Sequence, residues 1–201
     1  MVLGKKNIAK IENTVKEIEN TLCAEIVPAI LSRSDEYPAS HLRLGVLISL
    51  LISLPVAFYF STYLPYSLLL GFSFGYLFSR LFGPFNFLIK RDEVYTETIQ
   101  MAYAIFLENR IHLTKKRIGV LVFYSILEKR IIVLCDESVK NKVSNEVWRE
   151  LIRENIGKLK KINLTDAYCQ LLNKVGNTLE RDFAGTSDEN RLSNKLISDL
   201  A

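Results

Sequence analysis

The sequence predicts an α/β fold, an αβα sandwich, into which a long apolar helical hairpin is inserted. Two neighbouring apolar segments, Ile118–Ser125 and Arg130–Cys135, have the composition of buried strands. Segments with apolar residues at helical spacing lie on both sides of them, and a run without any charged residue extends from Leu44 to Ser79. In a chain of 201 residues these features indicate one domain with an inserted appendage.

The N-terminal part predicts one helix and one strand. Apolar residues recur every three or four positions over Lys5–Leu22, which predicts an amphipathic helix. The short apolar run Ala24–Leu31 is typical of a strand. Because Pro28 cannot donate a ladder hydrogen bond, we expect this strand at a sheet edge or at a bulge. A polar loop, Ser32–Pro38, then leads into the uncharged run.

The uncharged run predicts two membrane spans. Its length of about 36 residues is too great for one span of roughly 20 residues and suits two that are tightly joined. Turn-forming residues and Pro65 separate the spans, which we expect at 44–61 and 65–82 within a hairpin Leu44–Phe82. Pro55 is expected to kink the first span. Gly71 and Gly75 form a G-x-x-x-G pattern that allows close helix approach.

Flanking charge predicts the orientation of this hairpin. His41 and Arg43 precede it and Arg80 follows it, whereas the connecting turn carries no charge. The positive-inside rule then places both termini and the α/β domain in the cytoplasm, at the inner or plasma membrane. No secretory signal is expected at the start, because glutamates interrupt Met1–Glu19. The alternative is a soluble domain that buries both helices, which is uncommon for a chain of this length.

Beyond the hairpin the chain predicts a bend, a helix and a β-hairpin. Leu81–Ile89 remains apolar but is broken by a Gly-Pro pair, so we expect a bend in the membrane interface. Asp92–Glu108 has helical periodicity. The strands Ile118–Ser125 and Arg130–Cys135 are separated by only a short segment, which favours antiparallel pairing. Their apolar character on both faces predicts a sheet that is covered on both sides.

Two helices and a polar tail are predicted to complete the chain. One helix begins after Ser144, with Val147, Leu151, Ile156 and Leu159 expected to face inward, and the other opens at Thr165. We expect 184–201 to be disordered. The predicted organisation is therefore a first part of the α/β domain at 1–43, the hairpin at 44–82, a second part at 92–183, and the tail.

Composition excludes several classes of function. The net charge of +4 is not arranged as a stripe of basic and aromatic residues, so no nucleic-acid partner is expected. The three cysteines are far apart and there are only two histidines, which leaves no zinc motif and favours reduced, buried thiols. No phosphate-binding glycine loop, metalloprotease motif or nucleophile elbow occurs.

Residues Gly119 to Asp136 (GVLVFYSILEKRIIVLCD) resemble the signature of the TPM domain family. The pattern is an apolar strand, a short turn with Glu and Arg, a second apolar strand and an acidic residue at its end. Ala24–Val27 resembles the family's first strand, and Val143–Leu151 resembles the helix that follows the signature. The segment Ser34–Tyr37 before a hairpin is similar to bacterial members that carry a two-span membrane insertion.

The resemblance implies an α/β sandwich near a membrane. Some members of the family are described as acid phosphatases, some bind a divalent metal such as calcium beside acidic loop residues, and others assist membrane complexes. This chain departs from the lumenal members in having no expected signal peptide. It also has Thr114–Arg117 where those members carry an acidic, glycine-rich loop, and both departures weaken the transfer of phosphatase chemistry.

Asp136 is the leading candidate for chemistry. A carboxylate at the end of a buried strand is expected at the edge where α/β sheets bind ligands. With Glu25 and Glu137 it could hold a hard cation through oxygen ligands. The alternative, which we favour, is that Asp136 caps the turn that follows it.

For the other polar pair, Glu128 and Arg130, the structural alternative is favoured. Glu128 and Arg130 are a possible site pair or a solvated hairpin turn, and Thr114 begins a basic segment that suits phosphate or lipid headgroups. Ser125 has no histidine base in a recognisable context, and Trp148 is expected in the core.

These observations favour a membrane-anchored interaction or accessory module for a membrane complex, without catalysis. Its expected contacts are membrane lipid along Leu44–Phe82 and a membrane-protein partner. The alternative is a metal-dependent, phosphatase-like hydrolase that uses Asp136, and a third possibility is recognition of anionic lipid by the basic segments.

Overall fold

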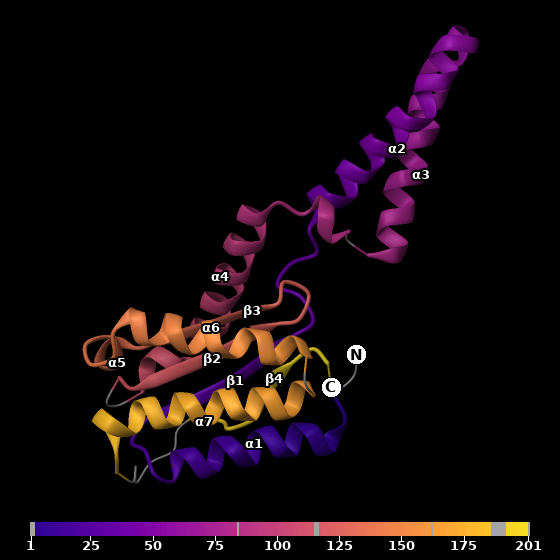
Figure 1. The fold of residues 1–201 in the computed structure, drawn as a ribbon. Coiled ribbons are helices and arrows are strands. Elements are labelled where there is room, and N and C mark those ends of the chain that lie inside the picture. The colour runs from indigo at the N-terminus through magenta and orange to yellow at the C-terminus, as the bar shows by residue number, and fades with distance from the viewer. Residues whose placement is uncertain (1–2, 84, 115–116, 162, 186–191, 201) are drawn as a thin grey trace. The chain divides into compact units, whose positions relative to one another are not determined.

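The computed structural model is a mixed α/β structure with a four-stranded sheet and, within the described residues, seven α-helices (Figure 1). It describes residues 3–83, 85–114, 117–161, 163–185 and 192–200. The chain divides into two compact units, each treated separately below. The α/β unit comprises Met1–Ser34 and Glu97–Ala201, and the hairpin unit comprises Asp35–Thr96.

The sheet has the strand order β3-β2-β1-β4. β1 (Glu25–Leu31) runs parallel to β2 (Gly119–Ser125), and β3 (Arg130–Cys135) returns antiparallel to β2. The predicted antiparallel pairing of these two neighbouring strands, β2 and β3, is therefore confirmed. The chain that joins β1 to β2 includes the whole hairpin unit, so the insertion lies within a crossover between parallel strands.

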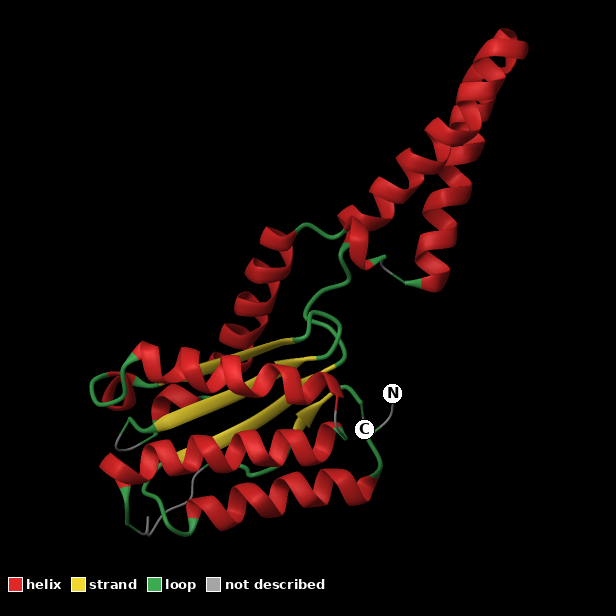
Figure 2. Ribbon diagram, in the orientation of Figure 1, coloured by secondary structure: helices red, strands yellow, loops and turns green. Residues whose placement is uncertain are grey.

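Three helices cover one face of the sheet: α1 (Lys5–Glu19), α6 (Asn145–Lys161) and α7 (Leu164–Phe183) (Figure 2). Their apolar residues pack on alternate strand residues such as Ile26, Ile30 and Val122. The amphipathic spacing read from the sequence is the reason for this layer, since it gives each helix one apolar side. Trp148 is buried in the same core, as expected.

A smaller core lies on the other face of the sheet. There α4 (Arg91–Glu108) contributes Ala102, Ile105 and Phe106, which pack on strand residues including Leu121 and Phe123. The short helix η3 (Ile111–Leu113) reaches the same face. A Cβ on Gly119 would lie 2.2 Å from the Ile111 carbonyl oxygen, so this close approach requires glycine.

β1 is not an outer strand of the sheet, although Pro28 itself has a neighbouring strand on one side only. β1 has β2 on one side and β4 (Ile197–Ser198) on the other. β4 pairs only with Ala29 and Ile30, so no strand lies opposite Pro28 on that side. Pro28 is tolerated because its missing N–H faces a stretch where β1 locally remains an edge.

Two C-terminal expectations also differ from the structure. Val147 was expected to face inward but is 43% exposed, whereas the neighbouring Trp148 is buried, because α6 is rotated relative to the predicted face. The tail was expected to lack structure, yet Leu192–Leu200 lies along β1, where Ile197 pairs with Ala29 and Leu200 is buried. Residues 186–191 of the expected tail lie outside the described residues.

The hairpin unit is built from two antiparallel helices, α2 (Pro38–Tyr59) and α3 (Leu64–Phe82). A single 3-10 turn, η1 (Ser61–Tyr63), connects them at the break that the sequence predicted. Gly83, with φ +86°, ends α3, and η2 (Asn86–Leu88) precedes α4. Pro55 lies within α2, as expected.

Candidate functional site

The α2–α3 hairpin buries small residues and exposes large apolar ones. Its buried positions are mainly glycine and serine: Ser40, Gly45, Ser49 and Ser53 on α2, and Ser67, Gly71, Gly75 and Ser79 on α3. In a water-soluble helical hairpin the large apolar residues would face inward. Small residues at a helix–helix interface are instead typical of helices that associate within lipid.

The two helix backbones lie close together at these small residues. A Cβ on Gly71 would be 2.8 Å from the Ser49 Cα, and one on Gly75 would be 3.0 Å from the Gly45 Cα. The Ser49 hydroxyl donates to the Leu68 carbonyl across the interface at 2.8 Å. The predicted G-x-x-x-G pattern of Gly71 and Gly75 therefore lies at the contact between the helices.

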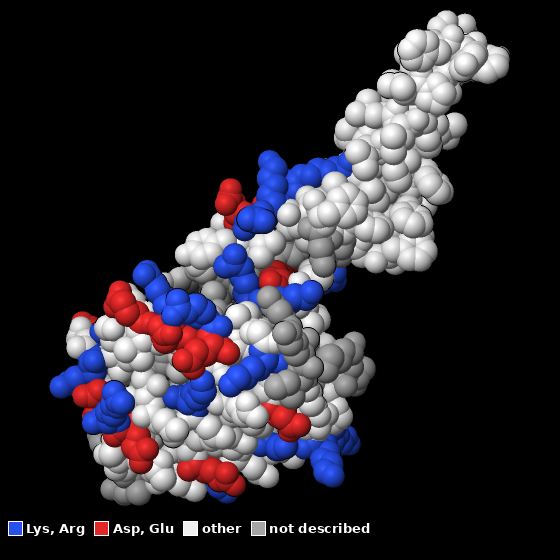
Figure 3. All heavy atoms as spheres, viewed as in Figure 1, with Lys and Arg blue, Asp and Glu red and all other residues white. Residues whose placement is uncertain are grey.

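The outer surface of the hairpin is apolar along its length. On the face shown in Figure 3 the hairpin is free of Lys, Arg, Asp and Glu except towards its base. Large side chains with more than half of their surface exposed include Leu50, Leu51, Leu54, Phe58, Phe60, Tyr63, Tyr66, Leu69, Leu70, Phe74 and Leu77. An exposed apolar surface of this extent marks a protein–protein or membrane interaction site.

Within the described residues, one helix is long and apolar enough to cross a membrane. This is α2, with 22 residues and a mean hydropathy of 2.0. Only 22% of its apolar window is buried inside the protein, which separates it from the core helix of a soluble domain. α3, with 19 residues, does not meet the same criterion.

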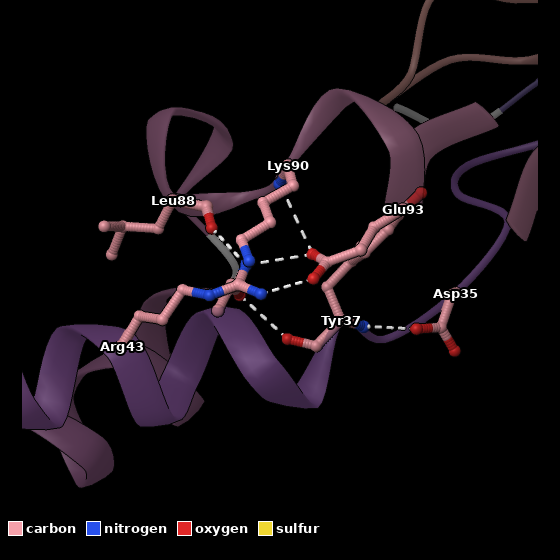
Figure 4. Close-up of polar contacts among 7 residues, drawn as sticks. Asp35, Tyr37, Arg43, Leu88, Lys90 and Glu93 are labelled. Atoms are coloured by element: carbon pink, nitrogen blue, oxygen red, sulfur yellow. Dashed lines mark hydrogen bonds and ion pairs between the residues drawn. The ribbon is translucent and has the colours of Figure 1, made fainter. Parts of the chain in front are cut away.

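An ion pair closes the base of the hairpin unit (Figure 4). Arg43 on α2 donates from Nη1 to Glu93 Oε2 at 2.9 Å and from Nη2 to Glu93 Oε1. The same Nη1 donates to the Leu88 carbonyl at 2.6 Å, so one guanidinium holds both η2 and the start of α4. The hydrogen bond from Arg43 lowers the pKa of Glu93 below its ordinary value.

The entrance to α2 is fixed by Asp35 and Tyr37. Tyr37 precedes the helix in a left-handed conformation, with φ 52°, and its side chain is buried. Its N–H donates to Asp35 Oδ2 at 2.8 Å (Figure 4), and Pro38 occupies the first turn, where no N–H is needed.

Asp136 lies at the opposite end of the sheet from the one expected. β3 is antiparallel to β2, so its C-terminal end lies beside the N-terminal ends of β1 and β2, where Asp136 N–H donates to the Gly119 carbonyl at 2.9 Å. Asp136 Oδ1 accepts from Glu137 N–H at 2.7 Å and caps α5 (Glu137–Lys140). The expected cap is therefore present, while Oδ2 is buried without a partner among the described residues.

The described residues contain no group of three or more potential metal ligands. Glu25 lies on the same sheet face as Asp136, but Gly119 stands between them in the register and Ile111 packs over that glycine. Residues two strands apart are separated by about 10 Å, and the Ile111 carbonyl fills the space over Gly119 between these two carboxylates. Glu25 Oε2 instead accepts from Leu192 N–H at 2.9 Å, and Glu137 pairs with Arg117 at 3.5 Å.

Glu128 organises the other end of the sheet. Its carboxylate accepts from the Ser125 hydroxyl and from Ser34 N–H, the latter at 2.8 Å. The β2–β3 turn is thereby tied to the chain leaving β1, and Leu127 N–H donates to the Ser32 carbonyl at 2.9 Å. Asp199 makes a further contact here, since its carboxylate accepts from Ser32 N–H at 2.7 Å. The sequence did not predict the contacts of Ser34 and Asp199, because they join segments that are far apart in the chain.

Two further residues that the sequence suggested for a site, Arg130 and Thr114, lie in the strand ladder and in a local hydrogen bond. Arg130 lies opposite Ser125 in the register, and Thr114 Oγ1 accepts from Ile118 N–H at 3.0 Å. Lys115 and Lys116 lie outside the described residues. All three cysteines are free, and burial raises the pKa of Cys135 to about 12, so this thiol is a poor nucleophile.

Comparison with known proteins supports the fold alone. No protein-family model matches the chain, and no curated protein matches its sequence. Among solved structures, the chain is similar to the NMR structure of the BA42 protein from the psychrophilic bacterium Bizionia argentinensis. The two are 14% identical, with a TM-score of 0.61 over 98% of this chain and 94% of that one.

Proposed function

We propose that α2 and α3 together form a two-span membrane hairpin that anchors the α/β unit as an interaction module for a membrane complex. The observation that carries this proposal is the inverted pattern of the hairpin, in which glycine and serine lie between the helices and leucine and phenylalanine lie outside. Water cannot drive such packing, because the contact buries little apolar surface. A bilayer would cover the outer surface instead.

Charge supports a particular orientation. Arg43 and Arg80 lie at the open end of the hairpin, Lys90 and Arg91 follow it, and η1 carries no charge. With these residues on the cytoplasmic side, both termini and the α/β unit lie in the cytoplasm. The α/β unit then presents a TPM-like sandwich at the inner surface of the membrane, without a catalytic constellation among its described residues.

Cysteine labelling in intact cells tests this topology. Ser61→Cys places a thiol in η1, and Ser193→Cys places one on the exposed surface of the tail; the native thiols are buried or half-buried. A membrane-impermeant maleimide should label Ser61→Cys in intact cells and Ser193→Cys only after lysis. Labelling of both in intact cells would indicate a single span, and labelling of neither would contradict the hairpin topology.

A matched pair of substitutions tests insertion itself. Leu51 in α2 is 67% exposed and Leu107 in α4 is 56% exposed, so Leu→Glu disturbs no core at either site. An acidic residue near the centre of a span opposes insertion by about 2.5–3.5 kcal/mol. Leu51→Glu should therefore reduce the fraction that resists carbonate extraction, while Leu107→Glu should not. Equal extraction of both variants would contradict the proposal.

The alternative, a metal-dependent hydrolase of phosphate esters, has one observation in its favour. Among the buried side-chain atoms of the described residues, Asp136 Oδ2 is the one carboxylate oxygen without a hydrogen-bond partner, so it is a candidate ligand for a cation. Titration of the purified protein with Ca²⁺ or Mn²⁺ tests it. A rise in the melting temperature that is absent in Asp136→Asn would support the hydrolase, and no rise in either protein would exclude this metal site.

A further inference from the structure

β3 leaves one edge of the sheet open. It is the outer strand in the order β3-β2-β1-β4, and Figure 2 shows no further strand beyond it. The opposite outer strand, β4, has only two residues, whereas β3 has six. A long outer strand presents a row of N–H and C=O groups that can pair with another strand.

The hydrogen-bonding groups of alternate β3 residues face this edge. Asp136 N–H donates to the Gly119 carbonyl, so in an antiparallel ladder the even-numbered residues of β3 bond to β2. The backbone groups of Ile131, Val133 and Cys135 therefore face away from β2. Across the described chain these three residues have no hydrogen bond to any other segment.

The side chains of β3 offer no protection against pairing. Natural edge strands are commonly blocked by an inward charge, a proline or a bulge. The five residues Ile131–Cys135 contain no charge and no proline, and their register with β2 runs without a bulge. Ile132, Val133 and Leu134 remain partly exposed.

We propose that two copies of this chain associate through antiparallel pairing of their β3 strands, which joins the two sheets into one. Val133 of one copy lies opposite Val133 of the other, so the ladder repeats around a two-fold axis. Every backbone group and side chain involved belongs to the α/β unit.

Charge complementarity selects the second copy and this register. β3 is preceded by Lys129 and begins with Arg130, and it is followed by Asp136 and Glu137. Antiparallel pairing centred on Val133 brings the basic end of β3 in each copy to the acidic end of β3 in the other, so that Lys129, in the turn before the strand, lies near Glu137, at the start of α5. Opposite charges on facing cross-strand residues stabilise the pair, and like charges weaken it.

Neighbouring registers lack this match. Because the free backbone groups belong to odd-numbered residues, an odd-numbered residue of one copy must pair with an odd-numbered residue of the other. The nearest alternative registers are therefore centred on Ile132 or on Leu134. Centring on Ile132 instead brings the turn that holds Glu128 in one copy towards Asp136 of the other, and both residues are acidic. Centring on Leu134 places Glu137 opposite Ile131, which leaves the charge without a counterpart.

A charge exchange on the full-length protein in detergent tests the pairing. The mass of the particle is measured by light scattering or native mass spectrometry over a range of concentrations. Lys129→Asp and Glu137→Lys each place like charges opposite one another twice per dimer, so each should raise the dissociation constant by about tenfold. Aspartate suits position 129, where φ is +53°. The double variant Lys129→Asp/Glu137→Lys should restore the affinity.

Proline at position 133 supplies a second test. Val133→Pro removes an N–H that faces the edge and leaves the β2 ladder intact, so the dimer should be lost while the circular dichroism spectrum is kept. Val133→Thr retains the N–H and is the matched control. A protein that is monomeric at every concentration overturns the proposal. A dimer unaffected by the charge exchange and by a folded Val133→Pro overturns it equally, because another surface then forms the dimer.

Discussion

At the scale of single residues, Tyr168 joins the two central strands. Its hydroxyl accepts from Ala29 N–H on β1 at 3.0 Å and donates to the Val122 carbonyl on β2 at 2.5 Å. The side chain is fully buried, and this burial raises the pKa of its hydroxyl. Next to Pro28, the phenol group supplies hydrogen bonds between the two strands.

Tyr168→Phe should lower the free energy of unfolding by about 1–3 kcal/mol, since it leaves a buried N–H and a buried carbonyl without this partner. Denaturant unfolding followed by circular dichroism measures the change. Tyr103→Phe, at an exposed position on α4, is the control and should be neutral. A Tyr168→Phe protein as stable as the wild type would show that the strands pair directly once the hydroxyl is removed.

Glu93 gives the base of the hairpin unit a defined pH dependence. Its pKa is lowered from the ordinary 4.5 mainly by the hydrogen bond from Arg43. A lowered carboxyl pKa means that the ion pair stabilises the folded state fully above pH 4.5, and that this contribution is lost as pH falls through the lowered pKa.

Glu93→Gln should accordingly speed hydrogen exchange of the backbone amides of Leu88–Val94 near pH 7. With both side chains about 30% exposed, the loss should be at most about 1 kcal/mol. The difference from the wild type should shrink as the pH falls below 4.5. Asp92→Asn removes the same charge from the same helical turn and should change little; a pH-independent difference would contradict this account.

At the scale of elements, the hairpin depends on the close contact of its helices at Gly71. Any side chain there meets the Ser49 backbone, which cannot move aside as a flexible side chain can. The exposed Ser73 lies two residues away on the outer surface of α3. The two positions therefore separate packing between the helices from the apolar character of the segment.

Gly71→Leu should force α2 and α3 apart and destabilise the hairpin by about 1–3 kcal/mol. Ser73→Leu adds the same apolar bulk on the outer surface and should leave the packing unchanged. Unfolding in increasing concentrations of sodium dodecyl sulfate, followed by loss of helicity, measures both. Equal stability of the two variants would mean that the small-residue contact does not hold the helices together.

At the scale of the whole molecule, the two units have separate sources of stability. Both apolar cores on the sheet consist of residues from Met1–Ser34 and Glu97–Ala201 alone. The hairpin unit contributes no residue to either core. Its stability derives from contacts between its own helices and from whatever covers their outer surface.

Replacing Asp35–Thr96 with a flexible linker of about ten glycine and serine residues should give a folded, water-soluble α/β protein. Since both cores remain complete, we expect cooperative thermal unfolding without detergent, monitored by circular dichroism at 222 nm. A full-length protein kept in the same detergent-free buffer should aggregate through its exposed apolar hairpin. Failure of the shortened chain to fold would mean that the insertion is needed to hold β1 and β2 in register.

Local patterns in the chain were enough to predict most of the helices and strands and the inserted hairpin. Hydrophobic periodicity predicted α1, α4 and α7, and the uninterrupted apolar segments predicted β2 and β3. The absence of charge from Leu44 to Ser79 and the break at Pro65 predicted the hairpin, because both signals are carried by residues near one another in the chain. Among the site residues, Asp136 was expected to cap a turn, and it does so for α5.

The contacts between distant segments could not be predicted from these local patterns. Because β3 is antiparallel to β2, Asp136 lies at the N-terminal end of the parallel strands. Ile111 packs over Gly119 and so lies between Asp136 and Glu25. The joining of Ser34 to Glu128 and the pairing of Ile197 with Ala29 arose in the same way. Each is a contact across a large sequence separation, determined by sheet register and helix packing, and no local pattern in the chain specifies such a contact.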